Sequence, residues 1–160
     1  MKIDVEIYCT MLKLIKSSNI FSEVLNRKIV SVGTIGEVEC CFKMKWDIAD
    51  YNNPGYDAID HSGNKIQIKT FVENGLSKMV PAFNPSAPKN HEVGKIAVVV
   101  LNKDLSLNRI LIATINDYKS KLKIVEERRN SKLRSGKRKE RFDLSIDEFE
   151  SIVHSENRII

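Results

Sequence analysis

The sequence predicts an α/β fold, with a mixed and largely antiparallel β-sheet flanked by α-helices. Three observations carry this prediction. Apolar residues recur at helical spacing near the N-terminus, two short runs alternate polar and apolar residues around a Gly/Asn/Ser turn, and the run KIAVVVL at 95–101 has the length of a buried strand. A chain of 160 residues can bury a substantial core. We expect one domain over 1–160, comprising an N-terminal helical extension (1–32), a core (33–114) and a basic helical C-terminal part (115–160).

The composition is that of an ordinary globular protein, with 42% hydrophobic and 29% charged residues. The longest apolar run, Ile96 to Leu101, is too short to span a bilayer. The N-terminal MKIDVEIYCT has an acid where a signal peptide needs basic and then apolar residues. Cys9, Cys40 and Cys41 show no CxxC spacing, so neither a disulfide framework nor a zinc cluster is expected. We expect a cytoplasmic location with reduced thiols.

Two helices are expected before the alternating stretch. From 4 to 18, the residues at helical spacing are Val5, Tyr8, Met11, Leu12 and Ile15, a stripe suited to packing on the sheet or on a partner subunit. The stretch 20–32 is ambiguous between a short helix and an extended segment. Gly33–Trp46 predicts a second helix, with Glu37 off its apolar stripe and Glu39 on another, solvated side. The helix dipole favours a carboxylate near the N-terminus, so Glu37 could act as a helix cap, or it could serve a metal site.

The stretch Gly55–Thr70, GYDAIDHSGNKIQIKT, predicts a β-hairpin with strands at 56–60 and 65–70. Because side chains alternate along a strand, Gln67 and Lys69 share one face, and Ile66 and Ile68 take the other.

Two registers are open for this hairpin. A loop at 61–64 would turn Asp57 away from Lys69, whereas a loop at 62–64 would set the two opposite each other. We expect the second outcome, with Asp57 and Lys69 on one face. Asp60 would then point to the opposite face, so it is the weaker candidate for a functional acid.

The second half of the chain begins with a long connection, 73–94, which contains three prolines and no periodicity. A connection of this length either serves a functional role, here an approach to a partner, or is a mobile surface excursion. The run at 95–101 then predicts a strand buried on both faces, and 108–115 a second strand antiparallel to it. A helix over 117–129 could be capped by Thr114 or Asn116, and Ser145 with Glu148 forms a capping box ahead of a short final helix.

Lys and Arg outnumber Asp and Glu by 26 to 21, a formal net charge of +5. This excess is compatible with a nucleic-acid partner but decides nothing by itself. Its distribution is more telling, because eight of the fourteen residues in 128–141 are basic. Such a run is usually solvated, yet it could also neutralise phosphates and release counterions. The candidate contacts are Arg134, Lys137, Arg138, Lys139 and Arg141.

Asp57, followed ten residues later by Gln67-Ile68-Lys69, resembles the motif of the PD-(D/E)xK nuclease superfamily, to which many restriction endonucleases and Holliday-junction resolvases belong. The sequence Gly33-Thr34-Ile35-Gly36-Glu37 also resembles the helix acid that precedes the hairpin in those enzymes. The resemblance covers roughly 33–114. It departs from the family pattern at Gln67, where the family has Asp or Glu.

The resemblance implies a restriction-endonuclease-like fold and a DNA endonuclease that depends on Mg²⁺ or Mn²⁺. It makes Asp57 the central metal ligand, assisted by the main-chain carbonyl of Ile68. Glu37 could supply the charge missing at Gln67, whose amide oxygen could still bind the cation. Lys69 would orient the attacking water and stabilise the transition state. The expected substrate is double-stranded DNA, and a homodimer remains open.

Two other functions are compatible with the sequence. The departure at Gln67 favours a catalytically weak or inactive DNA-binding module that keeps the nuclease fold. The chain could also be an interaction protein whose hairpin only resembles the motif. The histidines His61, His91 and His154 have no spacing that suggests a metal set, and no GxxxxGK[ST] loop points to an NTPase.

Overall fold

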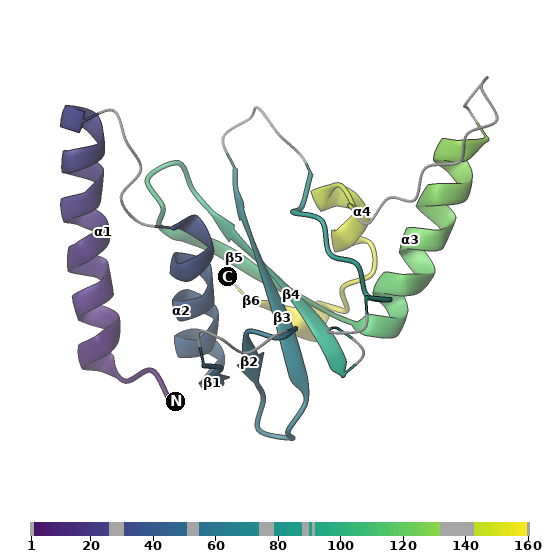
Figure 1. Ribbon diagram of the computed structural model, residues 1–160, viewed down its shortest axis with the longest axis horizontal. Coiled ribbons are helices and arrows are strands. Elements are labelled where there is room, and N and C mark those ends of the chain that lie inside the picture. The colour runs from purple at the N-terminus through teal and green to yellow at the C-terminus, as the bar shows by residue number, and fades with distance from the viewer. Residues whose placement is uncertain are drawn as a thin grey trace.

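The computed structural model describes residues 2–25, 31–50, 55–73, 79–87, 90, 92–131 and 143–159, without the side chains of 19–25. It is an α/β structure built on a six-stranded mixed sheet in the order β1-β2-β3-β4-β5-β6, flanked by helices (Figure 1). The strands are β1 (Asp47–Ile48), β2 (Ala58–Ile59), β3 (Lys65–Val72), β4 (Val93–Leu101), β5 (Leu107–Thr114) and β6 (Arg158–Ile159). Only β3 and β4 pair in parallel, so the predicted mixed, largely antiparallel sheet is confirmed.

The strand β4 forms the centre of the sheet. Every residue from Ile96 to Leu101 is buried, as its continuous apolar run predicted. Alternate side chains supply two different cores: Ala97, Val99 and Leu101 face one side, and Val98 and Val100 the other. The strand is therefore the shared wall between two layers of packing.

Helices α1 (Val5–Leu25) and α2 (Val32–Met44) cover one face of the sheet, and α3 (Ile115–Asn130) and α4 (Ile146–Glu150) cover the other (Figure 1). Of the two expected caps for α3, the structure has Thr114, whose hydroxyl accepts a hydrogen bond from the Asp117 amide at 3.1 Å. The capping box between Ser145 and Glu148 is formed as predicted. A 3₁₀ turn, η2 (Ser155–Asn157), leads into β6.

Helix α1 extends seven residues beyond the predicted end at residue 18 and packs on α2. The Tyr8 ring of α1 stacks on the Phe42 ring of α2, with the two ring centroids 3.9 Å apart. Ile15 is buried as expected, but Val5 is 65% exposed, so its assignment to the packing stripe is wrong. Val5 begins the helix, one turn before the first contact with α2.

Glu39 corrects a second expectation, because it is buried rather than solvated. Its side chain is 2% exposed and accepts hydrogen bonds from the Tyr8 hydroxyl at 3.1 and 3.2 Å. Burial raises the pKa of Glu39, although the Tyr8 hydroxyl opposes the shift, and burial beside this acid raises the pKa of Tyr8 to about 12. The periodicity of α2 could not reveal this, since α1 provides the cover.

The described part of the long connection between β3 and β4 is held against the core. The Val80 amide donates to the Leu144 carbonyl at 2.9 Å, and Met79 bridges to Ser145. Val80 is 2% and Phe83 3% exposed. The segment is therefore anchored in the core at Val80 and Phe83, while Pro81, Ala82 and Ser86 are exposed.

Candidate functional site

The hairpin between β2 and β3 adopts neither of the two expected registers. Ile59 pairs with Lys65 and Ala58 with Ile66, and the Asp60 amide donates to the Asn64 carbonyl at 3.0 Å. The loop therefore spans 61–63, not 61–64 or 62–64. The paired ladder ends at Ala58 and Ile66, so this register does not by itself set Asp57 opposite Gln67 or Lys69. The common face expected for Asp57 and Lys69 stays a prediction.

The carboxylate of Asp60 decides this turn. It accepts hydrogen bonds from the amides of Ser62 and Asn64, both at 2.9 Å, and from Lys95 Nζ at 2.7 Å. Gly63 takes a φ of +80°, which glycine adopts without strain. Burial acts against ionisation, yet the hydrogen bonds from Lys95, Asn64 and Ser62 lower the pKa of Asp60 to about 2. Asp60 is a structural acid, as its lower ranking in the sequence suggested.

The strand β2 ends where the candidate site begins. Within the described residues, β2 pairs with β3 only at Lys65 and Ile66. Beyond that point Asp57 makes the hydrogen bonds to β3. Its amide donates to the Ile66 carbonyl at 2.8 Å, and its Oδ2 accepts from the Ile68 amide at 2.7 Å. The Gln67 amide nitrogen also donates to Asp57 Oδ2. A side-chain oxygen thus occupies the place of the next main-chain acceptor on this edge of β3.

Helix α2 packs closely on β3, and this brings Glu37 near Asp57. Gly36 lies against Thr70, whose Oγ1 would overlap any Cβ at that position. The Thr70 hydroxyl also donates to the Gly33 carbonyl at 3.4 Å. Glu37 follows directly and is half-buried. The first turn of α2 contains no acid, so the interpretation of Glu37 as a helix cap is wrong.

Electrostatics join Asp57, Glu37 and Lys69 into one cluster. Burial raises the pKa of Asp57, against the opposing effects of the Ile68 amide, Lys69 and Gln67. Burial also raises the pKa of Glu37, the charge of Asp57 raises it further, and Lys69 lowers it. Two acids and one base thus share a partly dehydrated region, in which negative charge is costly.

The faces of β3 are as predicted. Ile66 and Ile68 belong to the core under α2, whereas Lys69 extends over the Phe83 ring on the α3 side. Phe83 was missed by the sequence analysis, because nothing in its local pattern marks a residue that will meet a lysine from another strand.

Cys40 and Cys41 were also missed as neighbours of the site. Both thiols are buried, and burial with the charge of nearby Asp57 raises both pKa values, that of Cys41 to about 12. They remain protonated thiols at neutral pH. Glycines at 33 and 36, followed by Glu37, are the one local signal for this close packing of α2 on the sheet.

The donor set suits a hard divalent cation. Within the described residues, no three side chains of His, Cys, Asp or Glu converge on one point. Asp57 and Glu37 provide two carboxylates, and Ile68 a main-chain carbonyl, all oxygen donors of the kind Mg²⁺ prefers. Burial raises the pKa of both carboxyl groups although Lys69 opposes the shift, so a bound cation would favour their ionised forms. Gln67 turns its amide nitrogen toward Asp57, so it supports this acid by donating a hydrogen bond.

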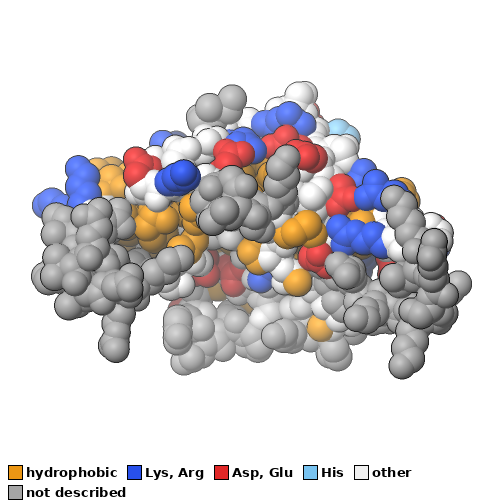
Figure 2. All heavy atoms as spheres, turned by 90° about the horizontal axis from the view of Figure 1, so that it is seen from above, with side chains coloured by type: hydrophobic (Ala, Val, Ile, Leu, Met, Phe, Trp, Pro, Cys, Tyr) orange, Lys and Arg blue, Asp and Glu red, His pale blue; other side chains and the backbone are white. Residues whose placement is uncertain are grey.

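The candidate phosphate contacts lie outside the described residues: Arg134, Lys137, Arg138, Lys139 and Arg141. The first two residues of the basic run are described, and both are engaged. Arg128 and Arg129 pair with Glu148, and Arg129 also with Asp143 at 3.5 Å. Among the coloured side chains of Figure 2, basic and acidic groups are interspersed on the face in view.

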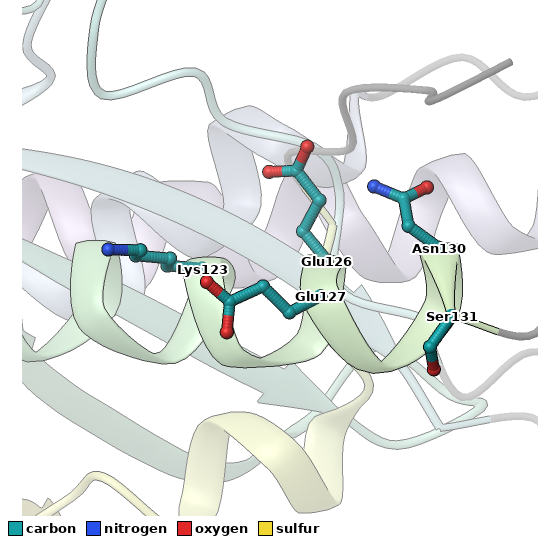
Figure 3. A pocket seen from close by; sticks show the side chains of 5 residues that line it. All are labelled: Lys123, Glu126, Glu127, Asn130 and Ser131. Carbon is teal, nitrogen blue, oxygen red and sulfur yellow. The ribbon is translucent and has the colours of Figure 1, made fainter. Parts of the chain in front are cut away.

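Figure 3 shows a hollow at the C-terminal end of α3. Its lining comes from one helix and comprises Lys123, Glu126, Glu127, Asn130 and Ser131. Two acids against one base make it a poor place for a phosphate. It does not compete with the Asp57 cluster as a nuclease site.

Within the described residues, no helix is both long and apolar enough to cross a membrane. Comparison with protein-family models and with curated proteins finds no match for the chain.

Proposed function

We propose that this protein is a divalent-metal-dependent endonuclease of the restriction-endonuclease type, which hydrolyses phosphodiester bonds in double-stranded DNA. One observation supports the proposal above all. Where β2 ends, Asp57 is bonded to Gln67 and Ile68, and Glu37 and Lys69 reach it from α2 and β3 within electrostatic range. These are the residues that the nuclease motif would use, on an α/β sheet of compatible class.

Each group has a role that fits its setting. Asp57, Glu37 and the Ile68 carbonyl would hold Mg²⁺ or Mn²⁺, and the bound cation would neutralise charge on the phosphate and acidify a water molecule. The Ile68 amide, 2.7 Å from Asp57 Oδ2, fixes the orientation of that carboxylate. Lys69 would orient the attacking water and stabilise the charge that develops on the phosphoryl oxygens.

Supercoiled plasmid, incubated with Mg²⁺ or Mn²⁺, tests the proposal directly. The wild-type protein should cut it, and Lys69→Ala should cut at least about 100-fold more slowly, the usual cost of removing one group that stabilises a transition state. Lys103→Ala is the matched control, because Lys103 is exposed in the turn between β4 and β5. Equal rates for the wild type and Lys69→Ala would refute the assignment. A parallel RNA substrate shows which nucleic acid is preferred.

A second candidate function is a DNA-binding module with little or no catalysis. The observation that favours it is the Gln67 amide, which donates to Asp57 where a carboxylate would add a third negative charge. Such a module would bind DNA with a strong salt dependence but leave plasmid intact. If Gln67→Glu then gained Mg²⁺ binding and cleavage, the fold would be that of a nuclease weakened at this position.

A further inference from the structure

Phe83, in the connection between β3 and β4, lies beneath the candidate lysine. Lys69 Nζ is 5.8 Å from the centroid of the Phe83 ring, within the range of a cation–π interaction. We propose that Phe83 is a positioning residue, whose ring holds the Lys69 ammonium group beside Asp57 and Glu37. Its catalytic consequence rests on the proposed function; the placement of the lysine does not.

The ring of Phe83 is well fixed for this purpose. It is 3% exposed and packs against Tyr118 of α3 at 6.0 Å between ring centroids. The Tyr118 hydroxyl donates to the Phe83 carbonyl at 3.4 Å, and the adjoining Val80 amide is bonded to Leu144. Contacts from α3 and from the C-terminal segment therefore set the position of the ring.

An aromatic ring suits the task better than an acid would. A lysine side chain has four flexible methylene groups, and its ammonium group has three donors. A carboxylate partner would hold it but would also neutralise its charge and occupy a donor. The face of Phe83 attracts the cation without accepting a hydrogen bond from it and without neutralising its charge.

A second lysine of the same hairpin provides an internal comparison. Lys65 Nζ lies 4.9 Å from the Tyr56 ring centroid, but it also pairs with Glu92. Glu92 has an exposed carboxylate, and Lys65 begins β3 at the turn end of the strand. Changes at Phe83 should leave Lys65 unaffected.

Lysine-labelled protein tests the placement without any assay of activity. The ring current of Phe83 should move the Lys69 ε-methylene NMR signal upfield, and Lys69→Met identifies that signal by its loss. Phe83→Leu should return it to the ordinary position while the Lys65 signal stays. Phe149→Leu is the matched control, because it removes a buried ring of the same core that does not face Lys69. A Lys69 signal at the ordinary position in the wild type would overturn the proposal.

Cleavage kinetics test the consequence. Trifluorophenylalanine at position 83 keeps the shape of the ring but removes most of the negative potential of its face, so folding is retained. The single-turnover rate should fall by about 2- to 30-fold, as expected for losing an attraction of about 0.5–2 kcal/mol. The Kd for DNA should not change, because a side chain 3% exposed does not contact DNA. An unchanged rate, or a change in Kd alone, would contradict the positioning role.

The two proposals fail in different ways. If the wild-type protein leaves plasmid and RNA intact, the proposed function fails, while the NMR signal still decides whether Phe83 places Lys69. If the wild type cuts DNA and the Lys69 signal is unshifted, the nuclease assignment stands and the role of Phe83 is refuted.

Discussion

Asp57 and Asp60 lie three residues apart on either side of the short strand β2, yet their surroundings shift their pKa values in opposite directions. Asp60 is nearly enclosed and saturated with donors from its own turn and from Lys95, and its pKa is lowered to about 2. Asp57 is also buried in part, but it shares its surroundings with the acid Glu37, and burial raises its pKa. The first acid stabilises the hairpin, whereas burial disfavours the charge of the second.

The largest effect on stability should come from Asp60. Asp60→Ala removes the ion pair with Lys95 and leaves the Ser62 and Asn64 amides without their acceptor. We expect the free energy of unfolding to fall by about 2–3 kcal/mol, below the usual cost of breaking a buried pair because Lys95 is partly exposed. Urea denaturation measures this loss.

Asp104→Ala is the matched control for that measurement. Asp104 accepts similar bonds from Ser106, but in the exposed turn after β4, so its loss should lower the free energy of unfolding much less than Asp60→Ala does. Equal losses in the two variants would mean that the Lys95 pair contributes nothing to stability.

At the site of Asp57 and Glu37, by contrast, removing an acid should raise the free energy of unfolding. Glu37→Gln should stabilise the metal-free protein by about 0.5–1 kcal/mol, because it removes one of two like charges from a partly dehydrated region. For a chain of this size that is a rise in Tm of roughly 1–4 °C. Millimolar Mg²⁺ or Mn²⁺ should raise the Tm of the wild type more than that of the variant. Destabilisation by Glu37→Gln, with an unchanged cation effect, would show that Glu37 is a structural residue.

The smallest effect is a pH dependence whose sign differs between the two sites. The pKa values of Asp57 and Glu37 lie above their ordinary values of 3.8 and 4.5, so the folded state holds these protons more tightly. Acidification from neutral pH should first stabilise the metal-free protein. The pKa of Asp60 lies below 3.8, so its contribution is complete above that pH and is lost as pH falls toward about 2.

Thermal unfolding across this range should therefore show a maximum at mildly acid pH. Glu37→Gln should flatten the limb above the maximum, and Asp60→Asn the limb below it. A wild-type profile that only falls on acidification from neutral pH would contradict the raised pKa values.

The sequence by itself determined the elements whose signals are local. The apolar run of β4, the Ser145–Glu148 capping box and the alternation along β3 each follow from hydrogen bonding or side-chain period within a few residues. The resemblance to the nuclease motif also singled out the candidate acids and Lys69, and their roles in catalysis stay predictions. These features depend on the chain near each residue and on little else.

Tertiary structure decided what depends on distant partners. The Asp60 carboxylate in the hairpin turn also accepts a hydrogen bond from Lys95, 35 residues away. The burial of Glu39 follows from Tyr8 on another helix, and the contact between Lys69 and Phe83 from a connection without periodicity. The local sequence pattern indicates which face of an element is apolar. It does not indicate which element will cover that face, because packing brings together residues that are far apart in the sequence.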